Sequence, residues 1–171
     1  ETNVETAVAA VGTTARLEFM LVDEEADLTQ VELGLKAAEA ALPGPEYASD
    51  RTLSDWLSDN GYLPPARRLM WEYDKVDKVD VRGPSYVIKD EVLLSGDDVN
   101  DAQTSPNPQT GMYYVALEFK PRGQAIFADV TGDNVGKRFA IVLDDKVRSA
   151  PVINERINGT ASISMGGQNI D

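Results

Sequence analysis

Two short apolar runs separated by a pair of aspartates constrain the fold more than any other feature of the sequence. Residues 139–143, "FAIVL", are wholly apolar, and residues 146–152, "KVRSAPV", follow after Asp144 and Asp145. Two such runs joined by two residues are typical of a β-hairpin. Aspartate tolerates the positive φ angles of a tight turn. Neighbouring strand residues point to opposite faces, so the two aspartates predict a turn rather than a shared metal site.

The residues just before this hairpin resemble part of a phosphate-binding loop. That motif requires an earlier glycine, then Gly-Lys and a Ser or Thr, between a strand and a helix. Here the earlier glycine is missing, and Arg138 follows Gly136 and Lys137. Gly136 instead follows a predicted helix, where glycine commonly ends the helix and basic residues suit its negative end. The pattern therefore predicts a helix stop rather than a nucleotide site.

Residues 129–134, "DVTGDN", bring oxygen-bearing side chains to alternate positions, as a calcium loop does. A calcium loop also needs glycine at its sixth position and glutamate at its twelfth. Asn134 and Ile141 stand there instead. The sequence therefore predicts no metal site in this segment.

Composition excludes several classes of chemistry. The chain has 171 residues, a net charge of −13, no cysteine and no histidine. Without these two residues, the common zinc sites and the Ser–His or Cys–His nucleophile pairs are excluded. Strong acidity disfavours binding to nucleic acid, which needs clustered basic residues. We expect no catalytic, metal-binding or cofactor-binding residue and no small-molecule substrate. A hydrolase that uses two facing carboxylates stays open as a remote alternative.

Apolar spacing predicts about three helices. A capping box at Thr29 and Glu32 indicates a helix that ends before Pro43. A second helix begins after Thr52 as its cap and ends at Asn60-Gly61. A third begins at Pro121, a residue favoured in the first turn, and runs to about residue 134.

Alternating apolar residues predict the strands. The expected strands lie at residues 15–22, 69–73, 86–94 with a break at Asp90-Glu91, 113–119 and 160–164, beside the hairpin. No apolar run approaches the ~20 residues that span a bilayer. Helices do not alternate regularly with strands, so the sequence predicts an α+β fold: a mixed or antiparallel sheet with about three helices packed on it.

Five aromatic residues offer material for a binding groove. Aromatics at such spacings belong more often to a core, but peptide recognition also uses apolar clefts and strand edges. Both interpretations stay open for Trp56, Trp71, Tyr73, Tyr113 and Tyr114.

The segment "DVTGDNVGKRFAIVLDDKVRSAPVINERINGTASIS", residues 129–164, closely resembles the end of the first periplasmic domain of the SecD family. Residues 13–24 and 92–131 also resemble that family. Asp145 and Thr160 depart from the pattern, because the family usually has glycine at both positions. The matching signature residues, which we expect to be mainly structural, are Asn134, Gly136, Lys137, Arg138, Asp144, Ser149, Ala150 and Pro151.

The resemblance implies a function and a location. SecD is a membrane protein of the RND superfamily that assists protein export, and its first periplasmic domain carries an inserted head lobe (P1 head). The resemblance implies that residues 1–171 form one fragment, the head with short flanks at about 1–24 and 160–171. It implies a non-enzymatic periplasmic lobe that engages unfolded preprotein, with SecF and the Sec channel as partners of the full-length protein. A structural lobe that docks onto translocon components or a periplasmic chaperone is the alternative. The sequence singles out no peptide-contact residue.

Overall fold

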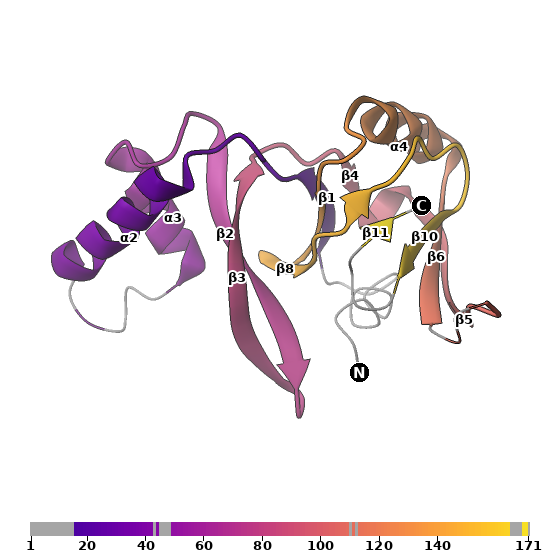
Figure 1. Cartoon of the computed structure of the whole chain (residues 1–171), viewed down its shortest axis with the longest axis horizontal. Helices are drawn as coiled ribbons and strands as arrows, with labels where there is room; N and C mark the ends of the chain where they lie inside the picture. The colour runs from indigo at the N-terminus through magenta and orange to yellow at the C-terminus, as the bar shows by residue number, and fades with distance from the viewer. Residues whose placement is uncertain are drawn as a thin grey trace.

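A computed structural model describes residues 16–42, 44, 49–109, 111, 113–164 and 169–170, with the side chains of 113, 164, 169 and 170 left out (Figure 1). These residues form three α-helices, one 3-10 turn and two β-sheets, which confirms the α+β fold class. The helices are α2 (Leu28–Ala41), α3 (Asp50–Asp59) and α4 (Pro121–Asp133), and the 3-10 turn is η2 (Gly96–Asp98). The strands are β1 (Leu17–Leu21), β2 (Arg67–Val76), β3 (Val79–Lys89), β4 (Leu94–Ser95), β5 (Val99–Pro106), β6 (Tyr113–Phe119), β7 (Phe139–Leu143), β8 (Lys146–Ser149), β9 (Val152–Ile153), β10 (Ala161–Ser164) and β11 (Asn169–Ile170).

The first sheet has six strands in the order β3-β2-β8-β7-β1-β4. β7 and β8 lie at its centre, and β7 pairs antiparallel with β1, so that Leu17 lies opposite Leu143. On its other edge, β8 joins β2 through a parallel pairing of Glu72 with Val147. The sheet curls, because Val22 just after β1 also forms an antiparallel bridge with Ile88 on β3.

The second sheet has five strands in the order β5-β6-β10-β11-β9. The chain passes from the first sheet into it twice, through η2 between β4 and β5 and again at Ala150 and Pro151 between β8 and β9. The strand predicted over 146–152 is therefore wrong as one element: β8 ends at Ser149 in the first sheet, and β9 pairs with β11 in the second. Proline has no N–H to donate to a ladder, which favours a break at this point.

Three buried clusters hold the two sheets and the helices together. The largest lies between β1, β7, β6, β10 and α4, and its centre is an aromatic group in which the Phe19 and Phe119 rings stand 5.5 Å apart, edge to face. A second lies inside the curl of the first sheet and includes Met20, Met70 and Val147. The third packs α2 and α3 against β2 and β3, around Leu57 and Trp71. In Figure 1, α2 and α3 lie at one end of the molecule and α4 at the other.

The helix starts differ from the expected caps. Asp27 caps α2, since its side chain accepts hydrogen bonds from the N–H groups of Thr29 and Gln30, so the predicted Thr29–Glu32 capping box is wrong. Ser49 rather than Thr52 caps α3. Both observed caps are good ones, and the sequence offered more than one candidate near each start. Pro121 does occupy the first turn of α4, as expected.

The long β2–β3 hairpin was only half predicted. The strand expected over 69–73 extends to Val76, and β3 begins at Val79, ten residues before its end at Lys89. Asp77 and Lys78 form its turn with φ angles of 49° and 66°. The predicted break at Asp90-Glu91 is confirmed, because β3 and β4 are separate strands.

Candidate functional site

The Asp144–Asp145 turn is confirmed, with φ angles of 48° and 65°. Asp144 binds the start of β1, because its carboxylate accepts a hydrogen bond from the N–H of Arg16 at 2.9 Å. The Asp145 carboxylate lies 2.8 Å from Nη2 of Arg16 and 3.4 Å from Nη1 of Arg68. The negative charge of Asp145, and to a smaller extent that of Glu18, raises the pKa of the Arg16 guanidinium. The residue that departs from the family pattern thus makes ion pairs that a glycine could not make.

The signature residues before this turn organise the exit from α4. Asn134 donates from its side chain to the carbonyl of Val130, which satisfies a group at the helix end. Gly136 has a φ of 84°, as a left-handed turn after the helix requires. Its N–H donates to the carbonyl of Ile153, and Ile153 donates back to the carbonyl of Lys137. These residues join α4 to β9 and form no phosphate loop.

The remaining signature residues lie where the chain changes sheet. The N–H of Arg138 donates to the Glu24 carboxylate, and its guanidinium stands 5.9 Å from the Tyr86 ring centroid. Ser149 is buried, and its hydroxyl has no hydrogen-bond partner in the described part of the chain. The carbonyl of Pro151 accepts from the N–H of Phe139. These contacts join neighbouring elements, and in the described part of the chain the structure does not gather the signature residues around one cavity.

The segment considered as a calcium loop lies within α4. Asp129, Thr131 and Asp133 belong to that helix, so their side chains do not converge as loop ligands would. Thr131 donates to the carbonyl of Phe127 and accepts from the N–H of Ile157, and Asp129 pairs with Arg156. Among the described residues, no group of three or more acidic side chains is arranged to hold a metal ion.

The candidate aromatics do not line one groove. Trp71 is buried in the α2–α3 cluster, and Trp56 and Tyr73 pack against that cluster from its edge. Tyr73 donates to the Asp50 carboxylate, and burial, with Asp50, raises the pKa of Tyr73 to about 12. Tyr114 lies half-buried on β6, and the side chain of Tyr113 is outside the described residues. The core interpretation holds for Trp71, while Trp56 also supports the wall of a cleft.

That cleft lies between the start of α2 and the end of α3. It has a volume of about 580 Å³ and is lined by residues 61–65 together with Asp27, Gln30 and Ser58. Leu63 is buried, whereas Pro64 and Pro65 are exposed and present apolar rings. Gln30 and Ser58 are also exposed, so polar groups lie at the opening. A concave site with apolar walls and a few polar groups is the usual form of a binding site.

The Tyr62 ring forms a fixed wall of this cleft. It stacks on Trp56, with centroids 5.9 Å apart and planes inclined by 14°. It also packs close to Gly34 of α2, where an added Cβ would lie 2.5 Å from the Tyr62 Cγ. Gly61, with a φ of 77°, ends α3 and turns the chain toward Tyr62. The ring is therefore held by contacts with both α2 and α3.

The cleft does not support the carboxylate hydrolase. That chemistry needs two acids that face each other across the substrate. Asp27 is the one carboxylate among the described residues that line the cleft, and it serves as a helix cap. The sequence pattern did not predict the cleft. The local feature that could have indicated it is the helix end at Asn60-Gly61, followed by Tyr62 and two prolines.

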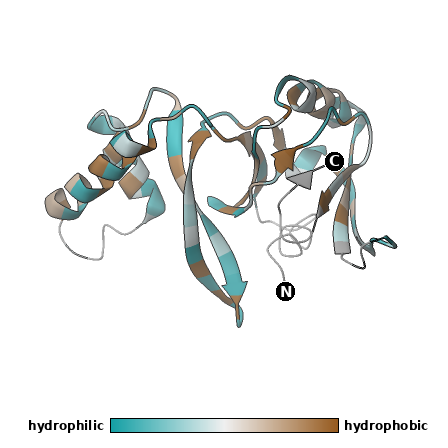
Figure 2. Cartoon of the chain, in the orientation of Figure 1, coloured by the Kyte–Doolittle hydropathy of each residue, from teal (hydrophilic) through white to brown (hydrophobic). Residues whose placement is uncertain are grey.

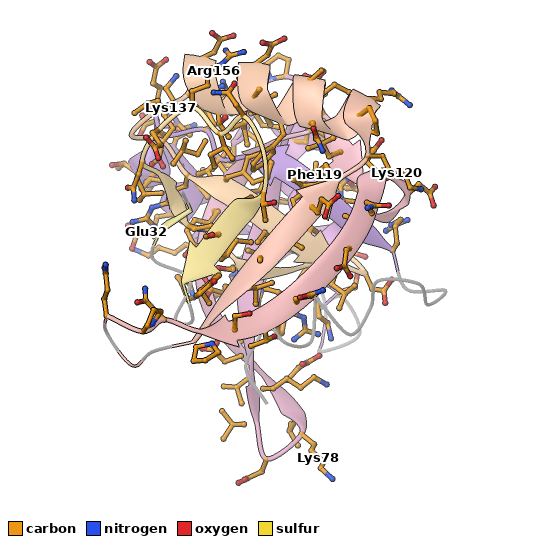
Figure 3. All side chains as sticks on the ribbon, turned by 90° about the vertical axis from the view of Figure 1, so that its right-hand side faces the viewer. Glu32, Lys78, Phe119, Lys120, Lys137 and Arg156 are labelled. Carbon is orange, nitrogen blue, oxygen red and sulfur yellow. The ribbon has the colours of Figure 1, made fainter. Side chains whose placement is uncertain are left out.

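The β2–β3 hairpin provides a second exposed surface, which we call the valine tip: Val76, Val79 and Val81, 53%, 63% and 47% exposed. Val76 and Val79 pair directly across the turn. Figure 2 shows apolar bands among hydrophilic ones near the free end of the hairpin, and Figure 3 places Lys78 at that end, far from Arg156 beside α4. An exposed apolar group of this kind is typical of an interaction surface.

The other face of the hairpin is held to β8 by charge. Asp80 lies 2.8 Å from Nη1 of Arg148 and 2.7 Å from Nζ of Lys146. The hydrogen bond from Arg148 is the main cause that holds the pKa of Asp80 well below its usual range, with Lys146 acting in the same direction. Arg148 is only 6% exposed, so Asp80 neutralises a nearly buried cation.

Chain similarity identifies the family. Residues 72–169 match the family described as SecDF, P1 head subdomain. The protein translocase subunit SecD of Calditerrivibrio nitroreducens is 36% identical over 166 residues, which cover 95% of this chain and 27% of that protein. SecD of Desulfurispirillum indicum is 37% identical over 165 residues, with the same two coverages. The chain thus spans 27% of the length of these relatives.

Solved structures of SecDF are also similar in sequence. SecDF of Thermus thermophilus, a translocon-associated membrane protein, is 30% identical over 94% of this chain and 18% of that one, with a TM-score of 0.44. SecDF in its super-membrane-facing form gives 30% identity and a TM-score of 0.47, over 95% of this chain and 18% of that one. In the part of the present chain that the structure describes, no helix is both long and apolar enough to cross a bilayer.

Proposed function

Because the chain belongs to the SecDF P1 head family, we propose that it is a periplasmic lobe that engages unfolded polypeptide during protein export. The match of residues 72–169 to that family is the observation that carries the proposal. It agrees with the names of the relatives, which are protein translocase subunits. The lobe acts by binding rather than by catalysis, and needs no cofactor.

The described surface supplies the means for such binding. A transient grip on many sequences requires contacts that are weak and tolerant of sequence, which apolar clefts and strand edges provide. The cleft at Tyr62 and the valine tip are two surfaces of this kind. We propose that SecF and the Sec channel are partners of the longer protein, and that residues 1–24 and 160–171 lead toward its base.

The experiment is site-specific photo-crosslinking in a full-length SecD that contains this sequence. A photoreactive residue is placed at one exposed position at a time, and export of a preprotein is arrested part-way. We expect crosslinks between the lobe and the arrested preprotein. If no position on the lobe captures it, the proposed function is wrong.

A second function is favoured by the valine tip. Three exposed valines at the end of a protruding hairpin suit docking onto a folded partner, such as a translocon component or a periplasmic chaperone. In the same experiment, a photoreactive residue at Val79 that captured a folded partner and never preprotein would favour this docking role.

A further inference from the structure

We propose that the cleft formed by α2, α3 and residues 61–65 is a docking site for extended polypeptide segments in which a lysine or arginine stands beside an apolar residue. The inference rests on the proposed function, since it names the class of segment that the lobe grips. Four features of the cleft carry it: its apolar wall, the helix end beside it, the charge of its rim and the charge of the surrounding lobe.

The apolar wall is prepared before a ligand arrives. Tyr62 stacks on Trp56 of α3 and packs close to Gly34 of α2, and the exposed rings of Pro64 and Pro65 also line the cleft. Rigid aromatic and proline surfaces lose little conformational freedom on binding, so they suit repeated brief contacts.

The end of α3 gives the cleft a negative potential. The last turn of a helix exposes carbonyl groups and the negative end of the helix dipole, where basic residues are usually stabilising. The last turn of α3 contains no basic residue, and Asp59 is its final residue. Ser58 and Gly61 of this helix end line the cleft. The carbonyls of Leu57 and Ser58 already accept from the N–H groups of Tyr62 and Gly61, so the helix dipole, rather than a free carbonyl, would stabilise a cation from a ligand here.

The start of α2 contributes the carboxylate of Asp27, whose negative charge adds to the negative potential at the end of α3. Asp27 accepts the hydrogen bonds from both Thr29 and Gln30 on Oδ1. Its Oδ2 therefore has no hydrogen bond from the described residues and can accept one from a ligand. Of the described residues that line the cleft, none is basic.

The acidic residues around the cleft also favour a positively charged ligand. Residues 23–63 contain ten acidic and two basic residues, a large share of the acidity of the whole chain. An acidic field of this kind attracts cationic segments and repels acidic ones. The stem of a lysine or arginine can pack on Tyr62 and Pro64 while its charged end reaches the carboxylate of Asp27. An apolar neighbour would contact the remaining wall.

Peptide-binding measurements test both the charge preference of the site and its location on the chain. The probes are two short unstructured peptides with fluorescent labels, identical except that one carries lysine where the other carries glutamate, each beside leucine. Fluorescence anisotropy with the purified chain should show binding of the lysine peptide, weakened by added salt, and at least tenfold weaker binding of the glutamate peptide, in line with a preference of ~1.4 kcal/mol. Equal affinity for the two peptides would overturn the proposal.

Two lysine substitutions locate the site. Gln30→Lys places a positive charge in the cleft at an exposed position, and we expect it to weaken the lysine peptide about fivefold or more. Thr104→Lys makes the same change of charge at an exposed position of β5, and should leave affinity within about twofold. Asp27→Asn keeps a residue that caps helices but removes the carboxylate, so it should weaken binding while the chain stays folded. Equal effects of the two lysine variants would place binding elsewhere.

Crosslinking in full-length SecD separates this inference from the proposed function. Photoreactive residues are placed at Gln30, Val79 and Thr104 during arrested export. Capture of preprotein at Gln30, enriched for basic segments, supports the inference. Capture at Val79 or Thr104 and not at Gln30 overturns the inference and leaves the proposed function standing. Absence of capture at any position on the lobe overturns both.

Discussion

The carboxylate of Asp80 on β3 lies 2.8 Å from Nη1 of Arg148 on β8, so the two residues join a protruding hairpin to the centre of the first sheet. The same guanidinium group donates to the backbone carbonyl of Tyr73 on β2. A nearly buried arginine thus binds both strands of the hairpin. This contact adds to the β2–β8 pairing at Glu72 in joining the hairpin to the first sheet.

Asp80→Asn should destabilise the chain by about 2 kcal/mol, because it leaves the Arg148 charge nearly buried without its counter-ion. The measurement is urea unfolding followed by circular dichroism at neutral pH. Asp77→Asn at the exposed hairpin turn is the matched control, since asparagine tolerates its positive φ, and it should change stability by less than ~0.5 kcal/mol. Similar losses for the two variants would contradict the role of the Asp80–Arg148 pair.

The same pair predicts a loss of stability in acid. Folding lowers the pKa of Asp80, mainly through the hydrogen bond from Arg148. Its contribution is therefore fully present above the ordinary aspartate pKa of about 3.9 and is lost as the pH falls toward the folded pKa. Unfolding experiments across this range should show a smaller decline in the Asp80→Asn variant than in the unchanged chain. A parallel decline in both would show that other carboxylates cause it.

Glu72 predicts the opposite dependence. Burial raises its pKa, although Tyr86 donates a hydrogen bond to its Oε2 at 2.8 Å and acts the other way. A carboxyl with a raised folded pKa contributes most below the ordinary glutamate pKa of about 4.3, and that contribution is lost as the pH rises through the folded value. Glu72→Gln should therefore be more stable than the unchanged chain at pH ~7, with the advantage absent at pH ~3. Exposed Glu91→Gln should show no such difference, and a pH-independent effect of Glu72→Gln would refute the explanation.

Two helical glycines should respond oppositely to alanine. In Gly34→Ala the new Cβ would meet the Tyr62 ring, which is held in place, and we expect a loss of about 1–3 kcal/mol despite the better helix propensity of alanine. In Gly132→Ala the nearest atom is Nη1 at the flexible end of Arg156, at 2.8 Å, so the variant should be neutral or up to ~1 kcal/mol more stable. Urea unfolding gives the stabilities, and tryptophan fluorescence reports on Trp56 beside Tyr62. If Gly34→Ala left the stability unchanged, the Tyr62 ring would be able to move aside for the new Cβ.

Because Asp145 has a φ of 65°, substitutions at this position can separate the effect of backbone strain on stability from the effect of charge. Asp145→Gly and Asp145→Ala both remove the pairs with exposed Arg16 and with Arg68, which is 17% exposed, so the loss of these ion pairs is common to the two variants and cancels when they are compared. Only glycine relieves the left-handed conformation, so the glycine variant should be about 1 kcal/mol more stable than the alanine variant. At Thr104, in a regular strand, the same two substitutions should rank in the reverse order. The same order at both positions would contradict a strained turn at Asp145.

Local patterns predicted the strands that are buried on one face or on both. Alternation at residues 113–119, the apolar run of residues 139–143 and the aspartate turn were enough to place β6 and the β7–β8 hairpin. The first half of β3 escaped prediction because its residues are exposed on both faces and contain Gly83 and Pro84, which are typical of loops and tolerated at a sheet edge. The change of sheet after Ser149 depends on a pairing with β11, which no neighbour in sequence reveals.

The signature residues were predicted to be mainly structural, and their contacts are with the backbone and with neighbouring elements. The cleft could not be predicted in the same way. Its wall needs Tyr62 to reach Gly34, and its charge needs the end of α3 to face the start of α2. Each of these residues has an ordinary local explanation as a turn, a cap or a helix end. Only the packing of two helices places them around one space.

The pairing of β1 with β7 sets an order for folding. Arg16 and Asp144 meet across 128 positions of sequence, so this strand pair has to wait until most of the chain is present. The helices and strands from α2 to β3 make most of their contacts with one another and can associate earlier, since closing short loops is fast and long ones slow. During synthesis, the cleft and the hairpin would therefore take shape first. The sheet that carries them would close last.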